Sequence, residues 1–307
     1  MPRDRAPLAL RLLWGALLCF AGGCNGENVS KSSSVLWEEF SGENALKHVQ
    51  ALVDFGPRPP ASAGLEHARE YITEQLKASG WEVRRQEFID QTPRGEVRFV
   101  NLIATFAGAK KPALFLLCSH YDTKIFDDAH FVGANDGGSS SGLLLEMARV
   151  LAKEPTLAGK VQLVFFDGEE AYVSFTETDG LYGSRHFAKT LSVEGRAKQF
   201  RGGILFDMVG DKSLTVTLPT DSPAEITLGI FAAAEALHVR KHFTYASGGI
   251  LDDHAPLNAI GIPTIDLIDF DYPPWHTPED TMDKLSAESL AIVGRVAARY
   301  LAETALK

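Results

Sequence analysis

The chain has 307 residues, of which 45% are hydrophobic and 23% are charged, and its formal net charge at pH 7 is −10. This length allows one large domain with a deep core, and the composition is that of an ordinary globular protein. The negative balance, without a basic stripe anywhere in the sequence, argues against nucleic acid as a partner. We interpret the acidic balance as a contribution to solubility.

The first 23 residues have the features of a secretory signal. Three arginines precede the apolar stretch LLWGALLCFAGG at 12–23, which is too short to span a membrane. Small residues directly before Cys24 resemble a bacterial lipoprotein signal, although Ala21 stands where leucine is usual. We therefore predict a signal peptide over 1–23 and a lipid anchor on Cys24. This places the protein in the cell envelope, outside the cytoplasm, with plain secretion as the alternative.

The rest of the sequence divides into a tether and one domain. The polar run NGENVSKSSS at 25–34 predicts a flexible tether over 24–38. Residues 39–307 show no repeat and no internal linker, which predicts a single catalytic α/β domain. Because Cys118 is the only cysteine in that domain, no disulfide framework is possible there. We expect Cys118 to be buried as a small hydrophobic residue.

Helical and strand-like patterns alternate from about residue 40 onward. Apolar residues at helical spacing predict helices at 63–80, 141–153, 221–237 and 285–306. Alternating or continuous apolar runs predict strands at 81–88, 97–106, 112–120, 161–170 and 202–210. Buried strands separated by helices predict a three-layer α/β sandwich, with a mainly parallel central sheet and helices on both faces.

Polar residues follow the ends of several of these strands. They are His120, Asp136, Glu169, Glu170 and Asp207, joined late in the sequence by Asp252 and His276. Each alone has a common structural explanation, since an aspartate before a helix is often its N-cap. Together they converge on the edge of the sheet where open α/β folds bind ligands, and their mutual repulsion requires a cation. Imidazole and carboxylate ligands without cysteine suit a catalytic zinc ion, beside which a free glutamate can act as general acid and base.

The segment DYPPWHTPEDT at 271–281 cannot be a regular helix or a central strand, because it contains two adjacent prolines. His276 therefore lies in an irregular loop beside Trp275. Such a loop is either a well-packed turn or part of a site, and the residues alone leave both interpretations open.

Several motifs together resemble a known superfamily. They are SHYDTK, FVGANDGGSSSGLLLEMAR, LVFFDGEEAYVSFTETDGLYGSRHFA, GGILFDMVG, LDDHAPLNAIGIPTIDLI and WHT, in the order and spacing of the zinc-dependent exopeptidases. Within that superfamily, residues 40–305 most resemble the animal-type glutaminyl-peptide cyclotransferases, or glutaminyl cyclases. The resemblance implies an acyltransferase that converts the N-terminal glutamine of peptides or proteins into pyroglutamate and releases ammonia. It also implies one zinc ion per chain, held by Asp136, Glu170 and His276.

The resemblance further implies roles for residues around the metal. Glu169 corresponds to the general acid/base, and Asp207 and Asp252 correspond to two aspartates that hold this glutamate and the substrate amine. Trp275 corresponds to an aromatic wall of the glutamine pocket.

Two positions of the predicted pocket depart from the family pattern. Phe175 stands where the cyclases usually carry a tryptophan, and the shorter loop before WHT leaves Tyr272 as the expected second aromatic wall. The cysteine pair of many secreted animal members is absent.

A two-zinc aminopeptidase of the same fold is the alternative. Its five ligands would be His120, Asp136, Glu170, Asp207 and His276, and Glu169 would activate a water molecule. The LYGSRH and LDDH segments and the tryptophan before His276 favour the cyclase. A catalytically inactive binding lipoprotein is a third hypothesis, which the intact set of metal-type residues disfavours. We expect a monomer that acts on peptide or protein N-termini and meets a membrane only through its lipid anchor.

Overall fold

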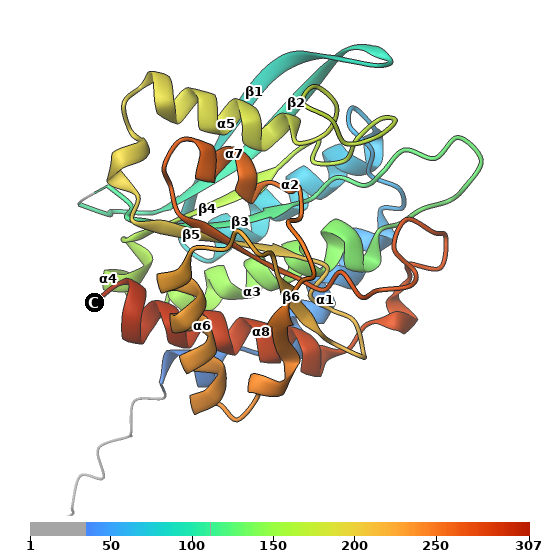
Figure 1. Cartoon of the computed structure of the whole chain (residues 1–307). Helices are drawn as coiled ribbons and strands as arrows, with labels where there is room; N and C mark the ends of the chain where they lie inside the picture. Colours follow the sequence, from blue (N-terminus) through green and yellow to red (C-terminus); the bar gives the residue numbers. More distant parts are fainter. Residues whose placement is uncertain (1–34, 111) are drawn as a thin grey trace, which may run out of the picture. The chain divides into compact units, whose positions relative to one another are not determined.

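The structure is a computed structural model that describes residues 35–110 and 112–307, which fall in one compact unit (Figure 1). The predicted signal peptide, Cys24 and residues 24–34 of the predicted tether lie outside the described residues. At the other end of that tether, Leu36 is buried in the hydrophobic core as part of the short 3₁₀-helix η1 (Leu36–Glu39). None of the helices in the described ranges has the length and apolarity to cross a membrane.

An eight-stranded sheet lies at the centre, in the order β1-β2-β4-β3-β5-β8-β6-β7. The strands are β1 (Trp81–Thr92), β2 (Gly95–Phe106), β3 (Phe115–His120), β4 (Val161–Phe166), β5 (Gly202–Asp207), β6 (Val216–Leu218), β7 (Phe243–Tyr245) and β8 (Thr264–Ile268). The neighbouring strands β4, β3, β5 and β8 are parallel. Antiparallel pairing joins β1, β2 and β4 on one side and β8 to β6 on the other, where the outermost pair of β6 and β7 is parallel again. The predicted α/β sandwich is confirmed, and its parallel pairing is concentrated at the centre of the sheet.

Helices cover both faces of the sheet (Figure 1). One face carries α1 (Gly42–Asp54), α2 (Ala63–Ala78), α3 (Ser140–Leu151), α6 (Ala224–Ala236) and α8 (Ala287–Tyr300), and the other carries α5 (Tyr182–Val193) and α7 (His254–Ala259). Successive side chains of a strand point to opposite faces, so Leu117 of β3 joins the larger core while Leu116 and Cys118 join the smaller one. Cys118 is fully buried, as predicted.

The predicted helices and strands are present; β1 and β2 are longer than predicted, and the parallel strands β3, β4 and β5 are shorter. The strand predicted at 161–170 ends at Phe166, so Glu169 and Glu170 lie in the loop beyond it. The strand predicted at 202–210 ends at Asp207, because Met208 adopts a positive φ of 47° that a strand cannot continue through. Both ends leave acidic side chains at the edge of the sheet.

Candidate active site

The parallel strands bring the predicted polar residues together. His120 is the last residue of β3 and Asp207 is the last residue of β5, and these two strands are neighbours. Glu169 and Glu170 follow β4, which pairs with β3 on its other side. Because parallel strands end at the same edge of a sheet, these side chains lie close together although up to 87 residues separate them.

Asp136 is placed by an interrupted helix. The segment Ala134–Ser139 precedes α3, and Asp136 within it has the non-helical angles φ −76° and ψ 106°. The next residue, Gly137, has a φ of +75°, and a Cβ atom there would lie 2.6 Å from the backbone oxygen of Asp122. The N-cap of α3 is Ser139, so the helix-capping explanation for Asp136 does not apply. The carboxylate of Asp136 points into the site instead.

The three residues predicted as zinc ligands meet at this edge. His276 Nε2 lies 3.4 Å from Asp136 Oδ2 and 3.2 Å from Glu170 Oε2. Ligand atoms of all three side chains lie within 4.8 Å of one another. His276 itself has a φ of +56°, a strained value for a residue other than glycine, inside a turn closed by the hydrogen bond from Thr277 N to Pro274 O. The loop at 271–281 is therefore a tight turn that also delivers a side chain to the site.

The charges of this group fit a bound metal ion. Asp136 Oδ2 and both carboxylate oxygens of Glu170 are buried and accept no hydrogen bond from the described part of the chain. Burial raises the pKa of Glu170 to about 7 and lowers the pKa of His276, so the imidazole is neutral and available as a ligand. Buried carboxylate oxygens without donors are costly unless a cation binds them. A divalent ion would supply the missing positive charge.

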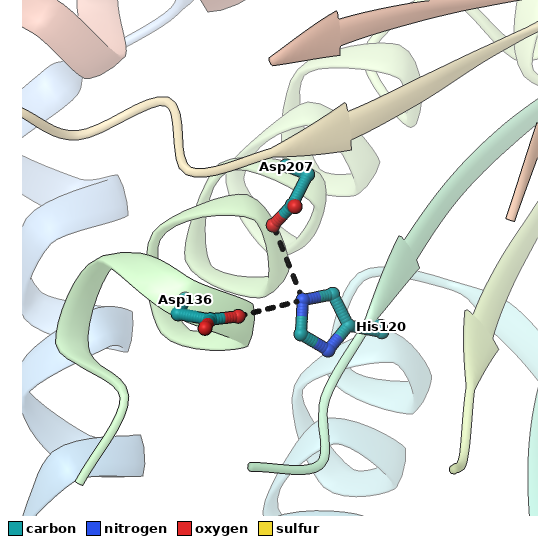
Figure 2. A group of neighbouring side chains, drawn as sticks. All are labelled: His120, Asp136 and Asp207. Atoms are coloured by element: carbon teal, nitrogen blue, oxygen red, sulfur yellow. Dashed lines mark hydrogen bonds and ion pairs between the residues drawn. The ribbon is translucent and has the colours of Figure 1, made fainter. Parts of the chain in front are cut away.

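A second group surrounds His120 (Figure 2). Its Nε2 atom lies between two carboxylates, 3.3 Å from Asp136 Oδ1 and 3.1 Å from Asp207 Oδ1. On the other side of the ring, Nδ1 is 3.5 Å from Asp122 Oδ1. Burial opposes a charged imidazole here, but the three carboxylates outweigh it and raise the pKa of His120 well above its usual value. The carboxylates favour a positive charge at this position, and ligand atoms of His120, Asp136 and Asp207 lie within 4.8 Å of one another, so this group could also hold a metal ion.

Glu169 belongs to neither group and lines a pocket of about 240 Å³. Asp207 and Asp252, the two predicted partners of Glu169, line the same pocket. The carboxylate of Asp122 accepts hydrogen bonds from the backbone N–H groups of Glu169 (3.1 Å) and Glu170 (3.3 Å), which fixes both glutamates. Burial raises the pKa of Glu169 well above its usual value and that of Asp252 to about 6.

The aromatic walls of the pocket differ in part from the prediction. Trp275 and Phe175 line the pocket, and the Trp275 ring stacks on the imidazole of His276 at a centroid distance of 4.1 Å. Tyr272 does not line it, so the prediction of Tyr272 as the second wall is wrong. Its side chain is buried, and its hydroxyl donates a hydrogen bond of 2.7 Å to Asp280. Phe270 takes that place, with its ring 5.0 Å from Trp275.

Some residues of the site were not predicted from the sequence. Asp280 is buried and accepts hydrogen bonds from the backbone N–H groups of Asn135 (2.8 Å) and Asp136 (3.1 Å). Lys124 Nζ lies 3.6 Å from Glu170 Oε2. A further buried group joins Asp252 to His254 and to Asp266 in the middle of β8. A charged residue inside an apolar strand was the one available signal for Asp266.

The bond between Tyr272 and Asp280 can be tested directly. Tyr272→Phe removes one donor to a buried carboxylate that also orients the backbone of Asp136, and we expect a loss of about 2 kcal/mol in the free energy of unfolding. Because Asp280 supports the backbone of Asp136, one of the three predicted zinc ligands, we expect the affinity for zinc to fall by roughly 10-fold as well. Chemical denaturation and zinc titration measure the two effects. Tyr245→Phe, at an exposed tyrosine, is the matched control. If Tyr272→Phe matched Tyr245→Phe in free energy of unfolding and in zinc affinity, the hydrogen bond to Asp280 would not support the site.

The fold and the site together define an exopeptidase-like α/β protein, with acidic and imidazole side chains gathered at the carboxyl edge of the parallel part of the sheet. The sequence model of peptidase family M28 matches residues 101–301, and the chain belongs to this family. It is 31% identical over 288 residues to a glutaminyl-peptide cyclotransferase of Bos taurus, covering 80% of this chain and 78% of that protein.

Solved structures of glutaminyl cyclases and of a zinc-dependent exopeptidase are also similar to this chain. A glutaminyl cyclase from an Acidobacteriales bacterium superimposes with a TM-score of 0.80 at 33% identity, covering 86% of this chain and 94% of that one. A Zn-dependent exopeptidase from Parabacteroides distasonis superimposes with a TM-score of 0.78 at 30% identity, covering 86% and 98%. The similarity to glutaminyl cyclases, predicted from the motifs, is confirmed.

Proposed function

We propose that this protein is a zinc-dependent glutaminyl-peptide cyclotransferase, an acyltransferase that converts the N-terminal glutamine of peptides or proteins into pyroglutamate. The observation that carries the proposal is the pocket itself. A buried glutamate that is outside the metal-type group, Glu169, shares a small aromatic-walled pocket with Asp136 and His276 of that group. The similarity to proteins named as glutaminyl cyclases supports the same activity.

Asp136, Glu170 and His276 would hold the zinc ion, since their buried oxygens lack donors and the imidazole is neutral. All three are ligand types that zinc accepts. A zinc ion bound there would supply Lewis-acid polarisation of the substrate's γ-carbonyl. The Parabacteroides protein, similar over most of its length, is described as zinc-dependent, which supports this choice of metal.

The chain's own residues would orient the substrate and move its proton. The α-nitrogen of the glutamine bonds to its own δ-carbon, and the bond from that carbon to the amide nitrogen breaks to release ammonia. Glu169 would take a proton from the α-amine and return it to the leaving nitrogen. Asp207 and Asp252 line the same pocket and would hold the amine. Because amine and carbonyl belong to one residue, holding that residue in a closed conformation supplies much of the rate enhancement.

The two-zinc aminopeptidase is the competing hypothesis, since ligand atoms of His120, Asp136 and Asp207 lie within 4.8 Å of one another and could hold a second ion. The tryptophan stacked on His276 and the similarity to proteins named as glutaminyl cyclases favour the cyclase. For the cyclase we expect one zinc ion per chain. Metal analysis of the purified protein, with the products of a glutamine-initiated peptide measured in parallel, distinguishes the two enzymes.

We further propose that the mature protein is a monomer attached to a membrane of the cell envelope through Cys24. Cys24→Ala removes the thiol that would carry the lipid, so the protein should move from the membrane fraction to the soluble fraction of the host cell. Immunoblots of the two fractions measure this. Cys118→Ala is the control, because that buried cysteine lies in the core. If Cys24→Ala stayed with the membranes as the unaltered protein does, the anchor would be wrong.

A further inference from the structure

The mouth of the pocket carries exposed apolar side chains. The base of the pocket is polar, formed by Asp136, Glu169, Asp207, Asp252 and His276. Leu251, Phe270 and Trp275 line its outer part and are 51%, 47% and 38% exposed. Large apolar side chains that gather in one exposed place mark a contact surface. We call Leu251 and Phe270, which line the outer part of the pocket and do not belong to its polar base, the apolar rim.

The size of the pocket determines which part of a bound peptide contacts this rim. This inference rests on the proposed cyclisation. A volume of about 240 Å³ is below the roughly 300–1,000 Å³ of pockets that enclose a whole small ligand. The pocket therefore takes one residue of a peptide. Since the α-amine and the γ-carbonyl of the glutamine must both lie at the polar base, the rest of the peptide leaves across the mouth. The side chain of the second residue is then the group nearest to the apolar rim.

The charges around the mouth favour an apolar second residue. No lysine or arginine is among the described residues that line the pocket, and four of its lining residues are acidic. Lys124, close to Glu170, is engaged with the backbone oxygen of Ala171 at 2.8 Å. An acidic second residue would find repulsion and no partner, whereas an aromatic one would cover Leu251 and Phe270 and remove apolar surface from water.

We propose that Leu251 and Phe270 make this protein selective for substrates with a bulky apolar residue directly after the N-terminal glutamine. An aromatic side chain in contact with both residues gains a hydrophobic interaction that a serine cannot make. Contacts of one apolar group in an enclosed pocket change kcat/KM by about 10- to 200-fold. The rim is open to solvent, so we expect a preference of about 10-fold in kcat/KM for the apolar substrate over the serine substrate.

Three tripeptide amides test the proposal: Gln-Phe-Ala, Gln-Ser-Ala and Gln-Asp-Ala. The unaltered protein should prefer phenylalanine to serine by about 10-fold in kcat/KM and should use the aspartate peptide least. In the double variant Leu251→Ser, Phe270→Ser, the ratio of phenylalanine to serine should fall toward one. Ile89→Ser, at a 67% exposed residue of β1, is the control and should keep the original ratio. Each single variant, checked by thermal unfolding, serves if the double variant fails to fold.

The outcomes separate this inference from the proposed function. Cyclisation of all three peptides at similar kcat/KM overturns the selectivity and leaves the cyclase intact. A preference for phenylalanine that survives in the folded double variant also overturns the role of Leu251 and Phe270. Absence of ammonia release from every peptide overturns the proposed function and this inference with it.

Discussion

Glu169→Gln is expected to lower kcat for pyroglutamate formation by about 10²–10⁴-fold, the usual contribution of a positioned general acid/base. Glutamine has nearly the same shape as glutamate but cannot take up and return the proton. Glu169 lies outside the group formed by Asp136, Glu170 and His276, so the zinc content should stay at that of the unaltered protein. Steady-state ammonia release and metal analysis on the same preparation measure both quantities.

Glu177→Gln is the matched control for this variant. Glu177 lies in the same loop between β4 and α5, but its side chain is exposed and is not among the residues that line the pocket. Its substitution makes the same change of charge at a short distance along the chain and should leave kcat unchanged. If Glu169→Gln kept near-normal turnover, another group would have to carry the proton, and the assignment of Glu169 would be wrong.

His276→Ala should lose zinc. The substitution removes the one nitrogen ligand of the group, and since changes to supporting residues alone cost 10–100-fold in affinity, we expect a loss of at least about 100-fold. The free energy of unfolding should respond as well. In the unaltered protein, zinc at 100 times its Kd should stabilise the fold by about 2.7 kcal/mol, and this gain should vanish in the variant.

Zinc titration and thermal unfolding with and without zinc measure these effects. His67→Ala, at an exposed histidine on α2, is the control and should keep both the affinity and the stabilisation. If His276→Ala bound zinc with unchanged affinity, His276 would not be a zinc ligand, and the loop at 271–281 would be only a well-packed turn.

The sequence was sufficient to predict the framework of the site. Buried apolar runs predicted the central strands, and parallel strands necessarily bring their carboxyl ends to one edge. His120 and Asp207 could therefore be expected at the same edge of the sheet, whereas the strand order that makes them neighbours is visible only in the structure. His276 is different, because no strand pattern places it, and its link to Asp136 and Glu170 came from the resemblance to the cyclases.

The choice of aromatic wall could not be predicted, for a physical reason. Phe270 and Tyr272 are two residues apart in an irregular segment, so no periodicity tells which one faces the pocket. The structure shows that the hydroxyl of Tyr272 reaches Asp280, a buried carboxylate eight residues further on. That hydrogen bond holds the Tyr272 side chain in the protein interior. Phe270 has no side-chain polar atom that needs a partner, and its ring is exposed at the mouth of the pocket.

The supporting carboxylates were missed for a related reason. Asp122 and Asp280 act by accepting hydrogen bonds from backbone N–H groups of Glu169 and Asp136, and any exposed aspartate would look the same in the sequence. Only the three-dimensional path of the chain reveals which carboxylate meets which backbone group. The short strands β6 and β7, of three residues each, are likewise too brief to show a pattern.

The most direct test of the proposed function uses the purified chain and a peptide with N-terminal glutamine. Ammonia, pyroglutamyl peptide and free glutamine are measured together, with and without a zinc chelator. We predict that ammonia and pyroglutamyl peptide appear in equal amounts, that free glutamine does not, and that the chelator abolishes both products. Release of free glutamine without ammonia would contradict the cyclase and identify an aminopeptidase instead.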